Sequence, residues 1–202
     1  RTIHRKMKTV CLDPGHGGTD PGACGPTLRE SDQTLDVCLR AREILKPYCN
    51  VIMTREDDEY VGLTARAEIS NRADADAFIS YHFNSADSNS ANGFEIFTTP
   101  AQNNSDKLAA CIWSAHRKQL PEQRDRGLKE ANFTVIRKAN CPAVLVEGEF
   151  IHTVAGEAFI TQNKQAMAHA VADGVLAYLG LDTAPVLTLE QRVARLEDHL
   201  NI

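Results

Sequence analysis

The chain has 202 residues, of which 43% are hydrophobic and 24% are charged, and its formal net charge is −5. This length and composition are typical of one globular domain with a short appendage, whose core needs no metal or disulfide to fold. The negative charge argues against a nucleic-acid partner, and no apolar run reaches the roughly 20 residues that span a membrane.

The first half of the chain predicts strands that alternate with helices. A β-branched and apolar run at residues 8–12 predicts a strand, which ends in the turn Asp13-Pro14-Gly15 and is followed by a glycine-rich loop. Apolar residues at helical spacing then predict a helix that begins at Ser31 or Asp32 and runs to about Lys46. The same criteria predict a strand at 50–54, a helix at 63–74 and a strand at 77–81.

The second half continues this alternation after a polar loop. We expect strands at 94–98, 133–137 and 143–146, and helices at 105–120 and 162–179. The run 143–146 is wholly apolar, which is typical of a central strand. The chain is therefore predicted to be a single α/β domain. It would have a twisted, mostly parallel sheet of about six strands, helices on both faces and a short C-terminal helix.

The two ends of the chain are expected to lie outside this domain. Residues 1–7 are basic and lack the apolar stretch of a signal peptide, so we interpret them as an extension that precedes a domain at 8–181. A linker at 182–186 leads to an amphipathic helix at 187–202, whose apolar residues step by four, three and four. Such a seam predicts either a homodimer through a short coiled coil or packing against the helix's own domain.

The six cysteines give no sign of a structural metal site. No two of them form a Cys-x-x-Cys pair, which argues against a zinc ribbon. Several fall in apolar segments, so we expect most of them to be reduced, buried small hydrophobic residues. They are Cys11, Cys24, Cys38, Cys49, Cys111 and Cys141.

Three polar residues stand where predicted strands end. His16 follows the first strand, His82 follows the strand at 77–81, and Glu147 follows the strand at 143–146. Ligand sites of open α/β sheets lie outside the carboxyl ends of the strands. Glu30 comes 14 residues after His16, just before the first helix. Taken singly, each of the four is also compatible with a purely structural role.

Together these residues match a known family in order and spacing. The sequence resembles the zinc N-acetylmuramoyl-L-alanine amidases of bacterial autolysins and phage endolysins over about residues 8–181. The segments of this chain that match the family are short strand and loop motifs and single residues. They are Val10 to Gly18, Glu30, Met53 to Arg55, Leu63 to Arg66, Asn71, Phe78 to Asn84, Arg126 to Lys129, Phe133 to Arg137, Pro142 to Glu147 and Phe150 to Ile151.

The resemblance implies roles for individual positions. It implies that His16, Glu30 and His82 bind one Zn²⁺ per chain, that Glu147 is the catalytic glutamate and that Asn84 lies near the substrate. A hydrolytic zinc site has three protein ligands and one open position, which this set provides.

Other positions are interpreted differently or depart from the family pattern. Arg66 and Asn71 match positions that we interpret as structural. Where the family has Glu-Thr-Gly-Phe this chain has Glu147-Gly148-Glu149-Phe150, so Glu149 is an alternative for the base.

The implied reaction is hydrolysis of the amide that joins the lactyl group of N-acetylmuramic acid to L-alanine in peptidoglycan. Such an enzyme acts at the bacterial cell wall. It would be a phage lysin that stays in the cytoplasm until release, or a domain of a secreted autolysin. Two alternatives remain at this point: a zinc peptidase that cuts within the stem peptide or its cross-bridge, and a non-catalytic wall-binding module.

Overall fold

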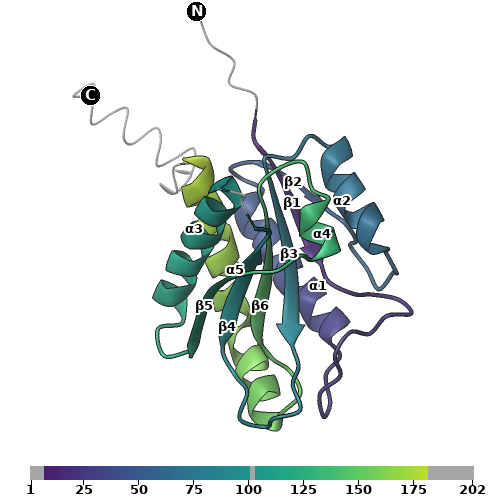
Figure 1. The fold of residues 1–202 in the computed structure, drawn as a ribbon, viewed down its shortest axis with the longest axis vertical. Coiled ribbons are helices and arrows are strands. Elements are labelled where there is room, and N and C mark those ends of the chain that lie inside the picture. The colour runs from purple at the N-terminus through teal and green to yellow at the C-terminus, as the bar shows by residue number, and fades with distance from the viewer. Residues whose placement is uncertain (1–6, 101–102, 182–202) are drawn as a thin grey trace, which may run out of the picture.

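Six strands form one sheet at the centre of the protein (Figure 1). In this computed structural model, which describes residues 7–100 and 103–181, they are β1 (Thr9–Pro14), β2 (Asn50–Met53), β3 (Ala77–Asn84), β4 (Phe94–Thr98), β5 (Asp125–Glu130) and β6 (Ala143–Phe150). Their spatial order is β2-β1-β3-β6-β4-β5. Neighbouring strands run parallel except β4 and β6, which pair antiparallel. The predicted α/β domain with a mostly parallel sheet is confirmed.

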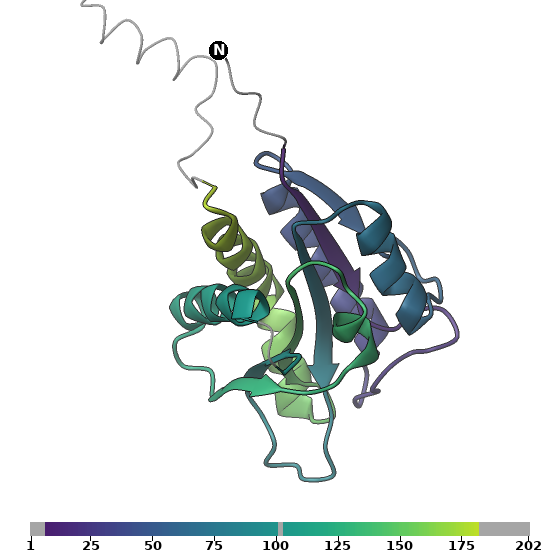
Figure 2. The same cartoon turned by 45° about the horizontal axis from the view of Figure 1, so that its top comes forward.

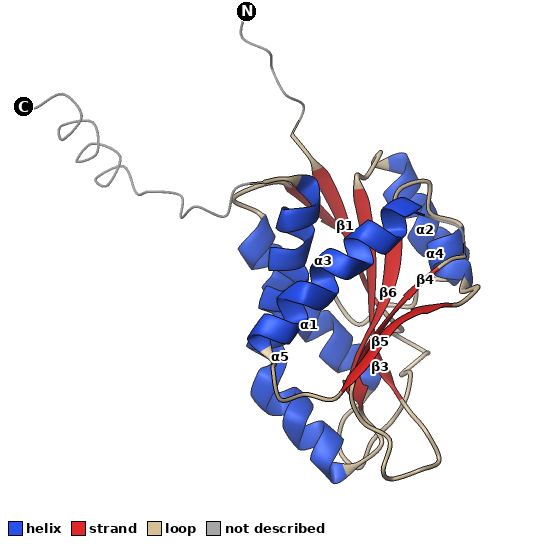
Figure 3. Ribbon diagram, turned by 60° about the vertical axis from the view of Figure 1, so that its left-hand side comes forward, coloured by secondary structure: helices blue, strands red, loops and turns tan. Residues whose placement is uncertain are grey.

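Helices cover both faces of this sheet (Figure 3). They are α1 (Glu30–Leu45), α2 (Leu63–Arg72), α3 (Asn103–Gln119), α4 (Thr134–Arg137) and α5 (Val154–Leu179). Helices α1, α3 and α5 lie on one face, where α3 packs across α5, and α2 and α4 lie on the other (Figures 2 and 3).

Each face of the sheet has its own core, and strand alternation divides the side chains between them. In β3, Ile79 and Tyr81 belong to the large core under α1, α3 and α5, whereas Phe78 belongs to the smaller core with Ile136 of α4. The smaller core covers only part of its face. The polar residue His82, which has the same parity as Phe78, therefore lies on a part of the sheet that stays accessible.

In the second half, one predicted strand is wrong and one strand was not predicted. The run at 133–137 is β-branched, which favours a strand, but it forms the one-turn helix α4. Its adjacent residues Val135 and Ile136 are both buried in the smaller core, which a strand with alternating sides would not achieve. The true edge strand is β5, which the sequence did not reveal because Asp125–Glu130 is polar and largely exposed.

Helix α5 is longer than predicted. It begins at Val154 rather than at residue 162, and the hydroxyl of Thr153 caps it by accepting a hydrogen bond of 3.0 Å from the backbone N–H of Gly156. The first turn gives little periodic signal, because Val154 is exposed and Gly156 has no side chain.

The remaining expectations concern the ends of the chain and the cysteines. The predicted linker at 182–186 and helix at 187–202 lie outside the described residues, as do residues 1–6, so the proposed homodimer contact stays a prediction. Among the described helices none is both long and apolar enough to cross a bilayer. All six cysteines fall in the described part and none is disulfide-bonded; Cys11, Cys38 and Cys49 are buried.

Candidate metal centre

The carboxyl ends of neighbouring strands bring the predicted site residues together. His16 lies two residues beyond β1, and His82 of β3 is paired in register with Glu147 of β6. Glu30 is the first residue of α1 and reaches the same place from the side. Four separate segments of the chain therefore converge at the carboxyl ends of the central strands.

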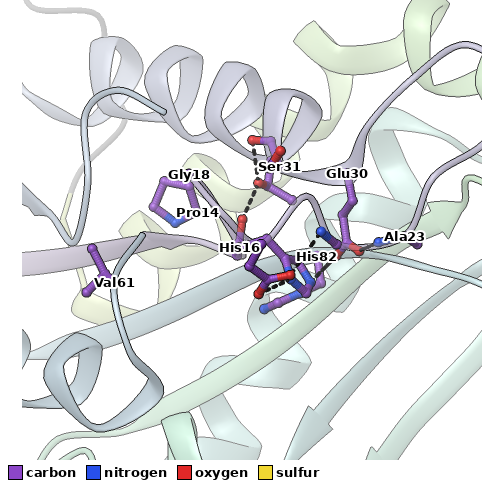
Figure 4. A network of polar contacts seen from close by, with 12 residues as sticks. Pro14, His16, Gly18, Ala23, Glu30, Ser31, Val61 and His82 are labelled. Atoms are coloured by element: carbon purple, nitrogen blue, oxygen red, sulfur yellow. Dashed lines mark hydrogen bonds and ion pairs between the residues drawn. The ribbon is translucent and has the colours of Figure 1, made fainter. Parts of the chain in front are cut away.

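His16, Glu30 and His82 form a compact set of ligand atoms (Figure 4). One nitrogen from each ring and one carboxylate oxygen all lie within 4.8 Å of one another. Glu30 Oε1 is 3.2 Å from His16 Nε2 and 2.9 Å from His82 Nδ1. Tetrahedral zinc, with bonds of about 2.0–2.1 Å, holds its ligand atoms roughly 3.3 Å apart. The donor set and its spacing thus fit a zinc ion, with only small adjustments.

Backbone groups hold the Glu30 carboxylate in place. The N–H of Ala23 donates to Oε2 at 2.8 Å and the N–H of Phe83 donates to Oε1 at 3.0 Å. Burial alone would raise the pKa of the Glu30 carboxyl, but hydrogen bonds and charge from His16 and His82 outweigh it, so the pKa is well below its ordinary value. Glu30 is therefore an anion at neutral pH, as a metal ligand must be.

His16 is oriented by its own loop. Its Nδ1 donates to Asp20 Oδ2 at 2.9 Å, which leaves Nε2 directed toward Glu30. A carboxylate on the outer ring nitrogen is the usual way in which a ligand histidine is fixed. The backbone of His16 has φ of 62°, a conformation that is rare outside glycine and concentrated at functional sites.

Two glycines are required by the crowding of these rings. A Cβ added to Gly15 would lie 2.2 Å from Cε1 of His82. A Cβ added to Gly22, whose φ is 68°, would lie 2.6 Å from Cδ2 of His16. The glycine-rich loop is thus shaped by the approach of backbone to the two imidazoles.

Two buried arginines clamp the turn that carries His16. Arg55 donates to the carbonyl oxygens of Pro14, Gly15 and Ser31 at 3.1, 2.9 and 2.8 Å. Arg66 donates to the carbonyl oxygen of His16 at 2.6 Å and to the buried Asp13 carboxylate at 2.9 Å. We had interpreted Arg66 as structural, and its contacts are of that kind.

Glu147 lies beside this cluster in an environment that favours its neutral form. Its side chain is partly buried, and its Oε2 has no hydrogen-bond partner among the described residues. Burial raises the pKa of the Glu147 carboxyl well above its ordinary value, and the nearby carboxylates Glu30 and Glu95 raise it further. A carboxyl group with a raised pKa can both accept and return a proton near neutral pH.

Glu149, the alternative base, lies in a different environment. The β3–β6 register shifts after His82–Glu147, so that Asn84 pairs with Phe150 and one extra residue is accommodated in β6. Glu149 is buried and accepts from the N–H of Gly93 at 2.6 Å and from Gln123 Nε2 at 2.8 Å. These contacts favour Glu147 over Glu149 as the proton-transfer group.

Four further polar residues contribute near the site, and two of them, Glu95 and Asp20, had no assigned role in the sequence. The Asn84 amide donates to Glu95 Oε1 at 2.7 Å, so the predicted substrate residue is held by a buried carboxylate. Glu95 was missed because a single charge in a short strand gives no signal, and Asp20 because loop carboxylates are common. Asn71, interpreted as structural, donates to the carbonyl oxygen of Lys138 at 2.9 Å and thereby ties α2 to the segment after α4.

Comparison with known proteins identifies one family. The model of the N-acetylmuramoyl-L-alanine amidase family matches residues 10–177. The sporulation-specific N-acetylmuramoyl-L-alanine amidase of Bacillus subtilis is 35% identical over 174 residues, which is 84% of this chain and 67% of that protein. The amidase LytC of the same organism is 36% identical over 85% of this chain and 35% of its own length. The chain thus spans between about a third and two thirds of these relatives.

Solved structures of amidases share the fold. The catalytic domain of the amidase CwlV from Bacillus (Paenibacillus) polymyxa superposes with a TM-score of 0.83 and 32% identity, covering 87% of this chain and all of that one. An N-acetylmuramoyl-L-alanine amidase from Clostridium difficile 630 gives a TM-score of 0.84 at 33% identity, covering 87% of this chain and 98% of that one.

A phage protein is also similar in sequence. An endolysin of Bacillus phage SPP1 is 32% identical over 86% of this chain and 67% of its own length.

Proposed function

Because the chain belongs to the N-acetylmuramoyl-L-alanine amidase family, we propose that it hydrolyses the amide between the lactyl group of N-acetylmuramic acid and L-alanine in peptidoglycan. Its place of action is then the bacterial cell wall. The observation that carries the proposal is the convergence of His16, Glu30 and His82 within 4.8 Å, beside the half-buried carboxyl of Glu147.

His16, Glu30 and His82 would hold one zinc ion. Zinc at such a site supplies a Lewis acid and lowers the pKa of water to about 7. Three protein ligands would leave the ion one position for water. The side chains of His16 and His82 are 25% and 15% exposed, so solvent reaches the site. Asp20 keeps the His16 ring in the tautomer whose Nε2 is free to bind.

Glu147 would move the proton. Its carboxylate accepts a proton from the attacking water, and its protonated form then donates to the departing amide nitrogen of L-alanine. Burial raises the pKa of the Glu147 carboxyl, which favours the protonated form that the second step requires. Asn84, the last residue of β3, donates a hydrogen bond to Glu95 and would help to bind the substrate.

The test is product identification on purified peptidoglycan with the zinc-loaded chain. We expect free lactyl carboxylates on intact glycan strands and released peptides that begin with L-alanine, both detected by mass spectrometry. Release of peptides cut between amino acids would show a zinc peptidase instead. Binding without any new chemical end would show a non-catalytic wall-binding module.

A further inference from the structure

Two cations lie next to the metal centre on the same face of the sheet. His82 of β3 is paired with Glu147 of β6, and Glu147 is paired with Glu95 of β4. Directly paired residues point to one face of a sheet. Arg126 and Lys129 of β5 extend this row, because both reach the carboxylate of Glu95. The proposed reaction gives neither cation a task.

The carboxylate of Glu95 has two cationic partners. Glu95 is buried, and its Oε2 accepts from Arg126 Nε at 3.0 Å and also from Lys129. Its Oε1 accepts from the neutral amide of Asn84 at 2.7 Å. One carboxylate therefore faces two cations.

The pairing of β5 with β4 is irregular beside Glu95. The β4–β5 register is irregular between Phe94–Asp125 and Ile96–Leu128, so Arg126 and Gly127 together lie opposite Glu95. Bulges of this kind re-aim side chains next to active sites.

The cations are held in place and remain accessible. Arg126 lies over the ring of Phe150, 4.8 Å from its centroid, and Lys129 lies 5.8 Å from that of Phe97. Their side chains are 25% and 37% exposed. Within the described part of the chain, the terminal guanidinium nitrogens of Arg126 have no hydrogen-bond partner, so they are available to an anion.

We propose that Arg126 and Lys129 form a subsite that binds a carboxylate of the stem peptide and so selects acidic substrates; the proposal rests on the proposed amidase function. Two strand spacings separate Glu147 from Arg126, which is about 10 Å. An extended peptide covers that distance in about three residues. The subsite thus fits an acidic residue close to the L-alanine whose amide is cut, and a planar guanidinium suits a carboxylate.

The experiment compares two soluble disaccharide-peptides that differ only in charge. One has the free carboxylates of its peptide, and in the other they are converted to carboxamides. For the acidic substrate, Arg126→Gln is expected to raise KM roughly tenfold, as loss of a charge-assisted hydrogen bond would, with kcat within about twofold. For the amidated substrate, Arg126→Gln and the unchanged protein should have the same KM. Arg126→Lys should recover part of the loss.

Controls separate this subsite from folding and from the proposed function. Lys129→Gln should resemble Arg126→Gln. Lys118 is an exposed residue of α3, so Lys118→Gln should leave KM unchanged for both substrates. Zinc content and melting temperature must match those of the unchanged protein. An equal rise in KM for both substrates, or a fall in kcat alone, would overturn the subsite. If the unchanged protein cleaves neither substrate, the amidase function itself fails.

Discussion

Glu147 and His82 are paired in register across β6 and β3, so that the proposed proton carrier and a proposed zinc ligand occupy adjacent positions on one face of the sheet. Glu147 belongs to a strand whose preceding residues are buried, and its position is fixed by the sheet rather than by a mobile loop. This arrangement separates zinc binding from proton transfer and makes the two roles separately testable.

Replacing the carboxyl of Glu147 should abolish turnover without loss of metal. We expect Glu147→Gln to lower kcat by about 10²–10⁴, the usual contribution of a general acid–base group, while one zinc per chain is still bound. The measurements are hydrolysis rate and metal content. Glu149→Gln is the matched control: it weakens buried hydrogen bonds from Gly93 and Gln123 and should lower the melting temperature. Loss of turnover in the folded Glu149 variant alone would contradict our assignment.

Zinc should stabilise the folded protein through His16, Glu30 and His82. A ligand that binds only the folded state adds about 2.7 kcal/mol at a concentration 100 times its Kd. We therefore expect the melting temperature of chelator-treated protein to rise on titration with zinc. His82→Ala should remove this rise together with activity. A zinc-dependent rise that persists in His82→Ala would place the ion elsewhere.

A single methyl group at Gly15 should disturb the His82 ring. The added Cβ would lie 2.2 Å from Cε1 of that ring, so the imidazole must move away from Glu30. We expect Gly15→Ala to weaken zinc binding at least tenfold, since a displaced ring loses its fixed coordination geometry. Gly62→Ala is the control, because its Cβ meets no atom within 4 Å. Calorimetric titration with zinc measures both, and equal affinities would contradict the steric argument.

Stability should fall in mild acid because of His116. This buried ring stacks on Phe94 with 3.5 Å between centroids, and its Nε2 forms a hydrogen bond with Gln123 Oε1. Burial lowers the pKa of His116 to about 4. The unfolded chain takes up the proton below pH 6.5, whereas the folded protein does so only near pH 4. The titration of His116 thus leaves the free energy of unfolding unchanged above pH 6.5. It lowers that free energy by about 3 kcal/mol as the pH falls to 4.

Denaturant unfolding across that pH range provides the measurement. The free energy of unfolding of the unchanged protein should decline more steeply between pH 6.5 and 4 than that of His116→Gln. Comparing the two curves removes the contribution of the carboxylates, which titrate in both proteins. Parallel curves would show that His116 does not contribute to the acid sensitivity.

The sequence was sufficient for the parts of the fold that follow simple periodicity. Apolar runs such as 143–146 and 77–81 located the central strands, and these strands in turn located His82 and Glu147 at their carboxyl ends. Edge strand β5 was not recognised because solvent exposure removes the hydrophobic signal. For the same reason Arg126 and Lys129 were not connected with Glu95, since their meeting depends on a strand pair that the sequence did not reveal.

The roles of Glu147 and Glu149 could not be separated from spacing alone. In a regular strand, residues two apart point to the same face, so both carboxylates would have been candidates. The register shift between the His82 and Asn84 pairs breaks that rule, and a bulge of this kind is formed by tertiary contacts rather than by a recognisable sequence pattern.

Arg55 and Arg66 fix the turn around His16 through backbone carbonyl oxygens, which are not the atoms that would bind the metal. The order of assembly follows from this. The polypeptide can complete its architecture in a zinc-poor environment and acquire the ion later, at a location already prepared for it. Small zinc domains behave in the opposite way, because they are unfolded when no metal is bound.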